Sequence, residues 1–294
     1  MAADDARAPD LRVAVVVPCH NDGLFLPEAL ASIGEQEACE LVVVDDGSTD
    51  PLTLRVLGEA KRRGILVVHQ PNKGPAEARM AGVRATQARY VHPLDADDRL
   101  TPGTLTALAD ALDANPQARA AWGDVRSIGS KACTTPKAPC IDPWRITYLN
   151  EIPGTCLMRR KALEEVNGWD LPFGYEDWDF WMKLAERGWD GVRLPRITLL
   201  YREHATPRGY MRDLARHETL RELLRSRHPG LFRARSTNWR KSRSALPVKL
   251  LFPLIDRIPL MSAKDKQRAW LRIRNVFEPH MRPSCKPSPD ESAS

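Results

Sequence analysis

Three aspartates, Asp95, Asp97 and Asp98, lie within four positions of the segment YVHPLDADDRLTPG (90–103). Carboxylates at this spacing repel one another, so the segment needs a positive group beside them. A divalent cation bound to a diphosphate meets that need, because a hard cation takes one or two protein carboxylates as ligands and fills its other positions with phosphate and water. The same residues would also suit a polar turn ahead of a capped helix. The triplet alone leaves both interpretations open.

Short apolar runs alternate with amphipathic segments around this triplet. Four runs rich in Val, Leu and Ile predict buried strands, at 12–18, 39–46, 65–70 and 88–95. Three segments between them predict helices with a proline in the first turn, at 26–36, 51–64 and 75–87. Asp50 is a predicted N-cap, and so is Thr101, ahead of a helix that starts at Pro102. The alternation is typical of βαβ units, which form a mostly parallel sheet with helices on both faces.

The predicted sheet brings two acidic groups to one edge. In open parallel sheets, ligands bind beyond the carboxyl ends of the strands. Asp45 and Asp46 close one predicted strand, and Asp95 and Asp97 follow another. We therefore expect both groups to face one crevice.

The pattern changes after about residue 125. Residues 127–143 are rich in Ser, Thr, Lys and Pro and predict a long loop, of the kind that often covers a site. A strand that runs into a short helix is predicted at 154–166, and a helix with acidic residues in its first turn at 176–188. A last strand is predicted at 197–204, and amphipathic helices follow from 209 onward.

Composition and cysteine placement indicate an intracellular globular protein. Hydrophobic residues make up 43% of the 294 and charged residues 28%, as is usual for such proteins. The N-terminal MAADDARAPD is acidic and lacks the apolar core of a signal peptide, and no apolar run approaches the roughly 18 residues of a membrane span. The six cysteines form no C-x-x-C pair, so we predict free or buried thiols in a reducing cytosol.

Positive charge is concentrated near the carboxyl terminus. The whole chain carries a net charge of +6, yet residues 205–275 contain 18 Lys and Arg against 5 Asp and Glu. This region contains no recognisable nucleic-acid-binding module, so we expect no nucleic-acid partner. Residues 243–274 mix Leu, Phe, Trp and Ile with basic residues, as do segments that contact an anionic membrane surface. An Arg-rich helical cap packed on the rest of the protein, or on a partner subunit, fits equally well.

Six motifs, in register, resemble those of the large inverting family-2 glycosyltransferases, whose catalytic domain has the GT-A nucleotide-diphospho-sugar fold. They are VVVPCHN (15–21), LVVVDDGSTD (41–50), QPNKGPAEARMAG (70–82), PLDADD (93–98), GYEDWDFWMKLAERG (174–188) and YREH (201–204). The resemblance covers about residues 10–205. It implies an α/β fold with a Rossmann-like, mostly parallel sheet, a nucleoside-diphosphate sugar donor, and Mn2+ or Mg2+ as cofactor.

The resemblance assigns donor-binding roles to the first four motifs. Asp45 or Asp46 would accept the N3–H of a uracil or thymine ring. Arg79 would point its planar set of donors toward nucleotide or phosphate. Asp95 would approach the ribose or donor sugar, and Asp97 would bind the metal. The other residues matched to donor binding are Pro18, Asn72 and Gly74. Taken one at a time, these residues are also explained by polar turns and a surface arginine, and Asp98 is expected to be structural.

The GYED motif supplies the acceptor side of the resemblance. Direct displacement needs a base on the opposite face of the sugar, which takes the proton of the acceptor hydroxyl. Asp177 matches the family base and Glu176 lies beside it; adjacent carboxylates in a partly closed site raise one pKa, which suits a base. The alternative is a pair of first-turn acids that stabilise a helix. His204 matches a metal or diphosphate contact, or is a surface histidine. The aromatic residues proposed to stack on the acceptor are Trp169 and Tyr175.

Absent motifs argue against several other chemistries. The first strand is followed by CHNDG, where a sugar-1-phosphate nucleotidyltransferase has a Gly-rich loop with an arginine. No G-x-G-x-x-G or Walker lysine motif is present, nor the Gln-x-x-Arg-Trp element of processive polysaccharide synthases. The sequence therefore predicts a metal-dependent inverting hexosyltransferase that moves one sugar, from a UDP- or dTDP-sugar, to a hydroxyl of a glycan, lipid-linked or small-molecule acceptor. Glycan, cell-envelope or glycoconjugate biosynthesis would use this reaction. The alternative is a GT-A-like nucleotide- or carbohydrate-binding or scaffolding protein without turnover.

The predicted organisation has four parts. Residues 1–10 form a disordered N terminus, 11–205 the GT-A domain, 206–279 a basic helical extension and 280–294 a disordered tail. We expect a cytoplasmic protein, with residues 205–275 either in peripheral contact with an anionic membrane or packed as a cap.

Overall fold

The computed structural model describes residues 11–129, 132–171, 174–204 and 216–286. Its strands are β1 (Val13–Cys19), β2 (Glu40–Asp46), β3 (Leu66–Gln70), β4 (Tyr90–Pro93), β5 (Arg99–Leu100), β6 (Ala120–Ile128), β7 (Ala132–Thr135), β8 (Leu157–Arg159), β9 (Val192–Arg202) and β10 (Ser284–Lys286). They form one sheet in the order β10-β7-β6-β8-β4-β1-β2-β3, and β9 pairs with both β6 and β5.

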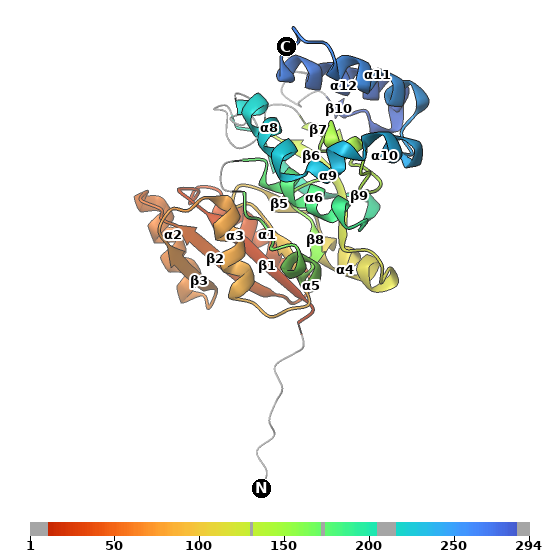
Figure 1. Cartoon of the computed structure of the whole chain (residues 1–294). Helices are drawn as coiled ribbons and strands as arrows, with labels where there is room; N and C mark the ends of the chain where they lie inside the picture. Colours follow the sequence, from red (N-terminus) through yellow and green to blue (C-terminus); the bar gives the residue numbers. More distant parts are fainter. Residues whose placement is uncertain (1–10, 130–131, 172–173, 205–215, 287–294) are drawn as a thin grey trace.

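Helices cover this sheet and extend beyond it at the carboxyl-terminal end of the chain (Figure 1). They are α1 (Leu26–Gly34), α2 (Pro51–Arg62), α3 (Pro75–Arg84), α4 (Thr104–Ala114), α5 (Arg160–Glu165), α6 (Glu176–Glu186), α8 (His217–Arg227), α9 (Pro229–Arg233), α10 (Arg235–Lys241), α11 (Leu246–Asp256) and α12 (Ala263–Phe277). Two short 3-10 helices are η1 (Arg145–Thr147) and η3 (Pro279–Met281).

The predicted parallel sheet is confirmed in the first half of the chain. Strands β3, β2, β1 and β4 are all parallel to one another. Beyond β4 the sheet is mixed, because β8 is antiparallel to both β4 and β6, whereas β9 is parallel to β6. The fold is thus α/β with a mostly parallel central part, as the βαβ pattern predicted.

Alternating side chains of β1 enter two different cores. Val13, Val15 and Val17 pack with residues of α1 and α4 on one face of the sheet, while Val16 packs with residues of α3 on the other. Gly82 of α3 lies against Val16, and a Cβ on this glycine would be 2.2 Å from Val16 Cγ1. Glycine therefore lets α3 approach the sheet closely, which brings the polar side chains of that helix near the strand ends.

The two predicted N-caps have different outcomes. Asp50 caps α2 as predicted, because its Oδ2 accepts the backbone N–H of Thr53 at 2.8 Å. The cap predicted at Thr101 is wrong, since α4 begins at Thr104 after Gly103 in a left-handed conformation. The Thr101 hydroxyl instead donates to the carbonyl of Ile197 in β9 at 2.7 Å, so a strand contact takes the group that would have capped the helix.

The segment 127–143, predicted as a long loop, contains a strand and a disulfide. Strand β7 pairs with β6 on one side and β10 on the other, and Cys133 in β7 is bonded to Cys285 in β10. The prediction of six free thiols is therefore wrong for these two cysteines, whose spacing of 152 positions gave no local signal. Strand β10 also occupies the start of the predicted disordered tail; residues 287–294 lie outside the described residues.

The carboxyl-terminal helices pack on the domain that precedes them. Trp144, Tyr148 and Leu149 around η1 form a buried cluster with Val248 and Phe252 of α11 and with Trp270 of α12. Arg145 pairs with Glu151 and Glu278, and Arg274 pairs with Glu151 at 3.1 Å. The cap predicted as one alternative for this region is thus present. The boundary predicted between 205 and 206 falls outside the described residues.

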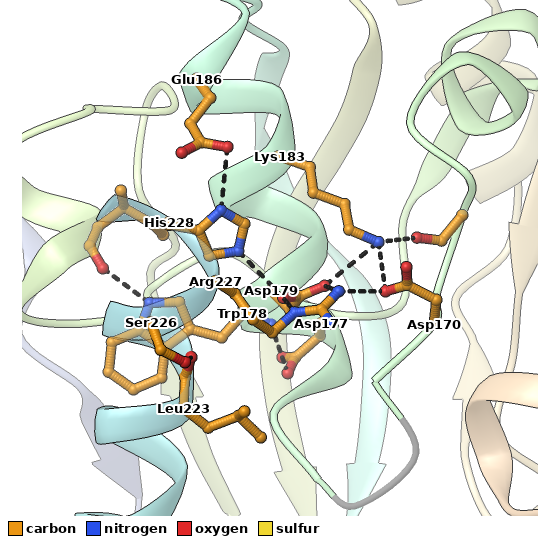
Figure 2. Close-up of polar contacts among 12 residues, drawn as sticks. Asp170, Asp177, Trp178, Asp179, Lys183, Glu186, Leu223, Ser226, Arg227 and His228 are labelled. Atoms are coloured by element: carbon orange, nitrogen blue, oxygen red, sulfur yellow. Dashed lines mark hydrogen bonds and ion pairs between the residues drawn. The ribbon is translucent and has the colours of Figure 1, made fainter. Parts of the chain in front are cut away.

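A buried carboxylate joins α6 to α8 and α9 (Figure 2). Asp179 of α6 is fully buried, accepts from Arg227 Nε at 2.6 Å, contacts His228 Nε2 at 3.0 Å, and lies 3.3 Å from Lys183 Nζ. Burial opposes its ionisation, but the His228 and Arg227 contacts outweigh burial and hold the pKa of Asp179 well below its usual range. The carboxyl-terminal extension therefore holds the helix whose first turn carries Glu176 and Asp177.

Across the described parts of the chain, no helix is both long enough and apolar enough to span a membrane.

Candidate active site

Asp46 organises the turn that leads into α3. Its Oδ1 accepts from Gln70 Nε2 at 2.7 Å and from the backbone N–H of Lys73 at 2.8 Å, and its Oδ2 accepts from the N–H of Gly74 at 2.8 Å. Gly74 is the N-cap of α3 with φ of 87°, a conformation that favours glycine. Asn72 in the same turn contacts the ring of His20. Asp46 and Gly74 thus stabilise the conformation of the loop that precedes α3.

Asp45 is the other candidate for a nucleobase contact, and it is as buried as Asp46. Asp45 Oδ1 accepts the backbone N–H of Ser48 at 2.9 Å, and its Oδ2 lies 2.9 Å from His69 Nδ1. Burial opposes ionisation, yet these hydrogen bonds outweigh it and lower the pKa of Asp45. An ionised carboxylate keeps lone pairs for a further donor. Pro18 lies opposite Val44, one position before Asp45, in the β1–β2 register.

Arg79 is the positive group between the acidic segments. Its guanidinium donates to Asp95 Oδ1 at 2.9 Å and to Glu176 Oε1 at 2.7 Å, and it lies over the Trp169 ring with 5.8 Å to the centroid. The residue is only 8% exposed, and the two carboxylates raise its pKa further above its usual range although burial opposes this. In this structure Arg79 bridges Asp95 and Glu176, and its contact with nucleotide or phosphate stays a prediction.

Asp97 and His204 come together from distant parts of the chain. His204 Nε2 lies 2.7 Å from Asp97 Oδ2. Burial, and then the charge of Asp95, raise the pKa of Asp97. Asp98 is 2% exposed and accepts the backbone N–H of Arg202 at 2.9 Å, which agrees with its predicted structural role.

The Asp97–His204 pair fits a divalent cation that shares its ligands with a diphosphate. No group of three or more His, Cys, Asp or Glu side chains in the described ranges could hold a metal ion by itself. One carboxylate oxygen and one imidazole nitrogen leave most positions of a six-coordinate ion for phosphate and water. A positive ion at this position would also stabilise the ionised form of Asp97, which burial and the charge of Asp95 disfavour.

Asp177 differs from its neighbour Glu176 in its partners. Glu176 is paired with Arg79, whereas Asp177 Oδ2 accepts from Asn150 Nδ2 at 2.9 Å and Oδ1 from the N–H of Trp178 at 2.8 Å. Both of those donors are neutral. Burial, and then the charge of Glu176, raise the pKa of Asp177 to about 6. A carboxyl group that titrates near neutral pH can accept a proton during a reaction and release it afterwards.

The two aromatic residues proposed for acceptor stacking are buried. Trp169 is 3% exposed and packs against Phe180, and Tyr175 is 4% exposed with its hydroxyl 2.6 Å from His217 Nδ1. Neither ring offers a free face in this structure, which does not support the stacking role. Trp178 and Trp181 are buried, as predicted for core residues.

Sequence reasoning missed two residues that shape the site. Asn150 is the side-chain donor to Asp177, and it belongs to an irregular segment where a lone asparagine gives no signal. Gly154 lies against the same carboxylate, since a Cβ there would be 3.3 Å from Asp177 Cβ. Both positions are recognisable only once the chain has folded around α6.

A GT-A-like sheet with acidic residues at the end of β2 and after β4, and a carboxylate pair at the start of α6, is the arrangement of a glycosyltransferase domain. The Glycosyl transferase family 2 model matches residues 14–166, and the chain belongs to this family. It is 28% identical over 204 residues to an uncharacterized protein of Sinorhizobium fredii, covering 66% of this chain and 22% of that protein. It is 31% identical over 196 residues to an uncharacterized glycosyltransferase of Mycobacterium bovis, covering 62% of this chain and 83% of that protein. The chain spans less than a quarter of the length of the Sinorhizobium relative.

Solved structures share the fold at low identity. TarS of S. aureus (residues 1–349, in complex with UDP-GlcNAc) aligns with a TM-score of 0.57 and 18% identity over 92% of this chain and 82% of that one. The mannosyltransferase PcManGT of Pyrobaculum calidifontis, in complex with GDP-Man and Mn2+, aligns with a TM-score of 0.53 and 21% identity over 91% and 87%. The predicted GT-A fold is thereby confirmed.

Proposed function

We propose that the protein moves one sugar from a nucleoside-diphosphate sugar to an acceptor hydroxyl, with inversion at the anomeric carbon. The observation that carries the proposal is the difference between two adjacent carboxylates. Arg79 neutralises Glu176, while Asp177 has neutral donors and a pKa raised to about 6. This arrangement supports Asp177 as the general base.

In the proposed reaction, the oxygen of the acceptor hydroxyl attacks the anomeric carbon while Asp177 takes the proton of that hydroxyl. The bond from that carbon to the diphosphate oxygen breaks on the opposite face, so the configuration inverts. Asp97 and His204 would hold Mn2+ or Mg2+, which when bound neutralises charge on the departing diphosphate. Asp45 would accept the N3–H of uracil or thymine, which favours a UDP- or dTDP-sugar.

Nucleotide binding tests the donor side of this proposal. We expect UDP or dTDP, with Mn2+ or Mg2+, to raise the melting temperature, because a ligand at 100 times its dissociation constant stabilises the folded state by about 2.7 kcal/mol. GDP should be measured under the same conditions as UDP and dTDP. The donor site would be wrong if none of the three diphosphates shifted the wild type in the presence of metal.

Two isosteric variants separate binding from chemistry. Asp97→Asn should abolish the metal-dependent part of the nucleotide shift, whereas Asp177→Asn should leave donor binding nearly unchanged. Asp177→Asn should lower transfer by about 10²–10⁴-fold, the range typical for loss of a general base. Near-normal transfer by Asp177→Asn, or a product that keeps the donor's anomeric configuration, would remove Asp177 from the base role.

A further inference from the structure

Helix α11 presents a row of uncovered leucines. Leu246, Leu250 and Leu254 are 61%, 51% and 58% exposed, while Val248 and Phe252 on the other side of the helix are fully buried. At about 100° per residue, the three leucines lie within about 80° of one another around the helix axis. Single exposed leucines are normal on a protein surface, but a contiguous apolar row marks an interaction site.

The row continues past the end of the helix. Ile258 is 40% exposed and Leu260 is 97% exposed. Figure 1 shows α11 and α12 at the end of the molecule away from β2 and β3, so this apolar surface is remote from the nucleotide-binding loops. The surface does not belong to the proposed transfer site.

An arginine-rich cavity of about 510 Å³ opens beside this row, between α10 and α11. Its lining includes Arg233, Arg240 and Arg257, all exposed, together with the rings of Trp144 and Trp239. Within the described residues, none of these three arginines has an ion pair or a side-chain hydrogen bond. Arg257 falls in the same angular sector of α11 as the leucines, so the cavity and the apolar row form one surface.

The acidic residue of the cavity is already neutralised. Asp256 lies 2.7 Å from Arg235, 3.4 Å from Arg225 and 3.8 Å from Arg221, and although burial opposes ionisation, these arginines lower its pKa. Arg235 is also tied to Thr147, whose Oγ1 accepts its Nε–H at 2.9 Å. The positive charge of Arg233, Arg240 and Arg257 is therefore left for an anion from outside the protein.

We propose that the α11 surface docks on an anionic phospholipid membrane. The surface comprises Leu246, Leu250, Leu254, Ile258 and Leu260 with the cavity arginines. The apolar side chains enter the interface between head groups and acyl chains, and the arginines contact lipid phosphates. An apolar row bordered by unpaired arginines matches that boundary, since it offers apolar surface and phosphate oxygens side by side. The proposal is independent of the transfer chemistry.

Vesicle co-sedimentation of the full chain tests this docking. We expect binding to vesicles of phosphatidylcholine mixed with phosphatidylglycerol, and little binding to phosphatidylcholine alone. Replacing Arg233, Arg240 and Arg257 together by Gln should weaken binding on the order of a hundredfold, since each basic residue near an anionic surface contributes about fivefold. Leu250→Ser with Leu254→Ser should weaken it about tenfold or more.

Matched controls come from α2, at the opposite end of the chain's fold. Leu54 is 47% exposed, and Arg55, Arg62 and Arg63 are exposed there as well. Leu54→Ser, and the change of these three arginines to Gln, should leave vesicle binding unchanged. Equal thermal melting of all variants establishes that folding is intact.

Three results would overturn the proposal. The first is equal binding to neutral and anionic vesicles, and the second is equal loss of binding in the α2 controls. The third is binding of inorganic pyrophosphate at the arginine cavity with no binding to vesicles, which would make the cavity a site for a small anion.

Discussion

Replacing Asp177 by asparagine should stabilise the protein at neutral pH while it removes transfer. Burial and the neighbouring charge of Glu176 raise the pKa of Asp177 from 3.8 to about 6. The folded protein therefore binds the Asp177 proton more tightly than the unfolded chain does. Ionising this carboxyl group costs stability that an uncharged asparagine of the same size does not lose.

The magnitude follows from the difference in pKa. About two pH units correspond to about 3 kcal/mol of unfolding free energy. Because the pKa is raised in the folded state, this cost is absent below about pH 4, grows between about pH 4 and 6, and is complete above about pH 6. Asparagine loses the hydrogen bond from Asn150, which is worth about 1 kcal/mol. The net gain should be about 2 kcal/mol near pH 7.5 and less than about 1 kcal/mol near pH 5.

Urea unfolding of wild type and Asp177→Asn at several pH values between about 5 and 7.5, without nucleotide or metal, measures this gain. Asp179→Asn is the matched control on the same helix, because the pKa of Asp179 is lowered by its contacts with His228 and Arg227. That variant should be destabilised throughout this pH range. A free-energy gap for Asp177→Asn that stays constant with pH, or a loss of stability near pH 7.5, would refute the raised pKa.

Three further outcomes are expected. Arg79→Gln should cost about 3 kcal/mol in urea unfolding, because it leaves Asp95 and Glu176 without their shared partner; a cost under about 1 kcal/mol would contradict the bridge. His204→Ala should reduce the metal-dependent melting shift produced by UDP without changing the shift in the absence of metal, and an unchanged shift would exclude His204 as a ligand. Cys285→Ser should lower stability by up to about 4 kcal/mol under oxidising conditions and make melting insensitive to reductant, whereas Cys140→Ser should do neither.

The sequence by itself determined the order of the elements from β1 to β4 and which of these strand ends carry acidic residues. Buried strands and amphipathic helices have local signatures, with periods of 2 and 3.6 residues, so β1 to β4 and α1 to α3 were predictable from windows of about ten residues. Asp45 lies in the last two positions of β2 and Asp95 two positions after β4, so their placement at one edge of the sheet needed only the topology of parallel strands. The six motifs indicated the family to which the chain belongs.

Only the tertiary structure decided how these residues are paired. Arg79 and Glu176 lie 97 positions apart, and Asp97 and His204 lie 107 apart, yet each pair is within 2.7 Å. The fold likewise brings Cys133 to Cys285, and Asp179 to Arg227 and His228 of the carboxyl-terminal region. Charge pairing and burial depend on which surfaces meet after folding, and no local pattern encodes that. For this reason the sequence distinguished Asp177 from Glu176 only through the family resemblance, whereas the fold pairs Glu176 with Arg79 and raises the pKa of Asp177 to about 6.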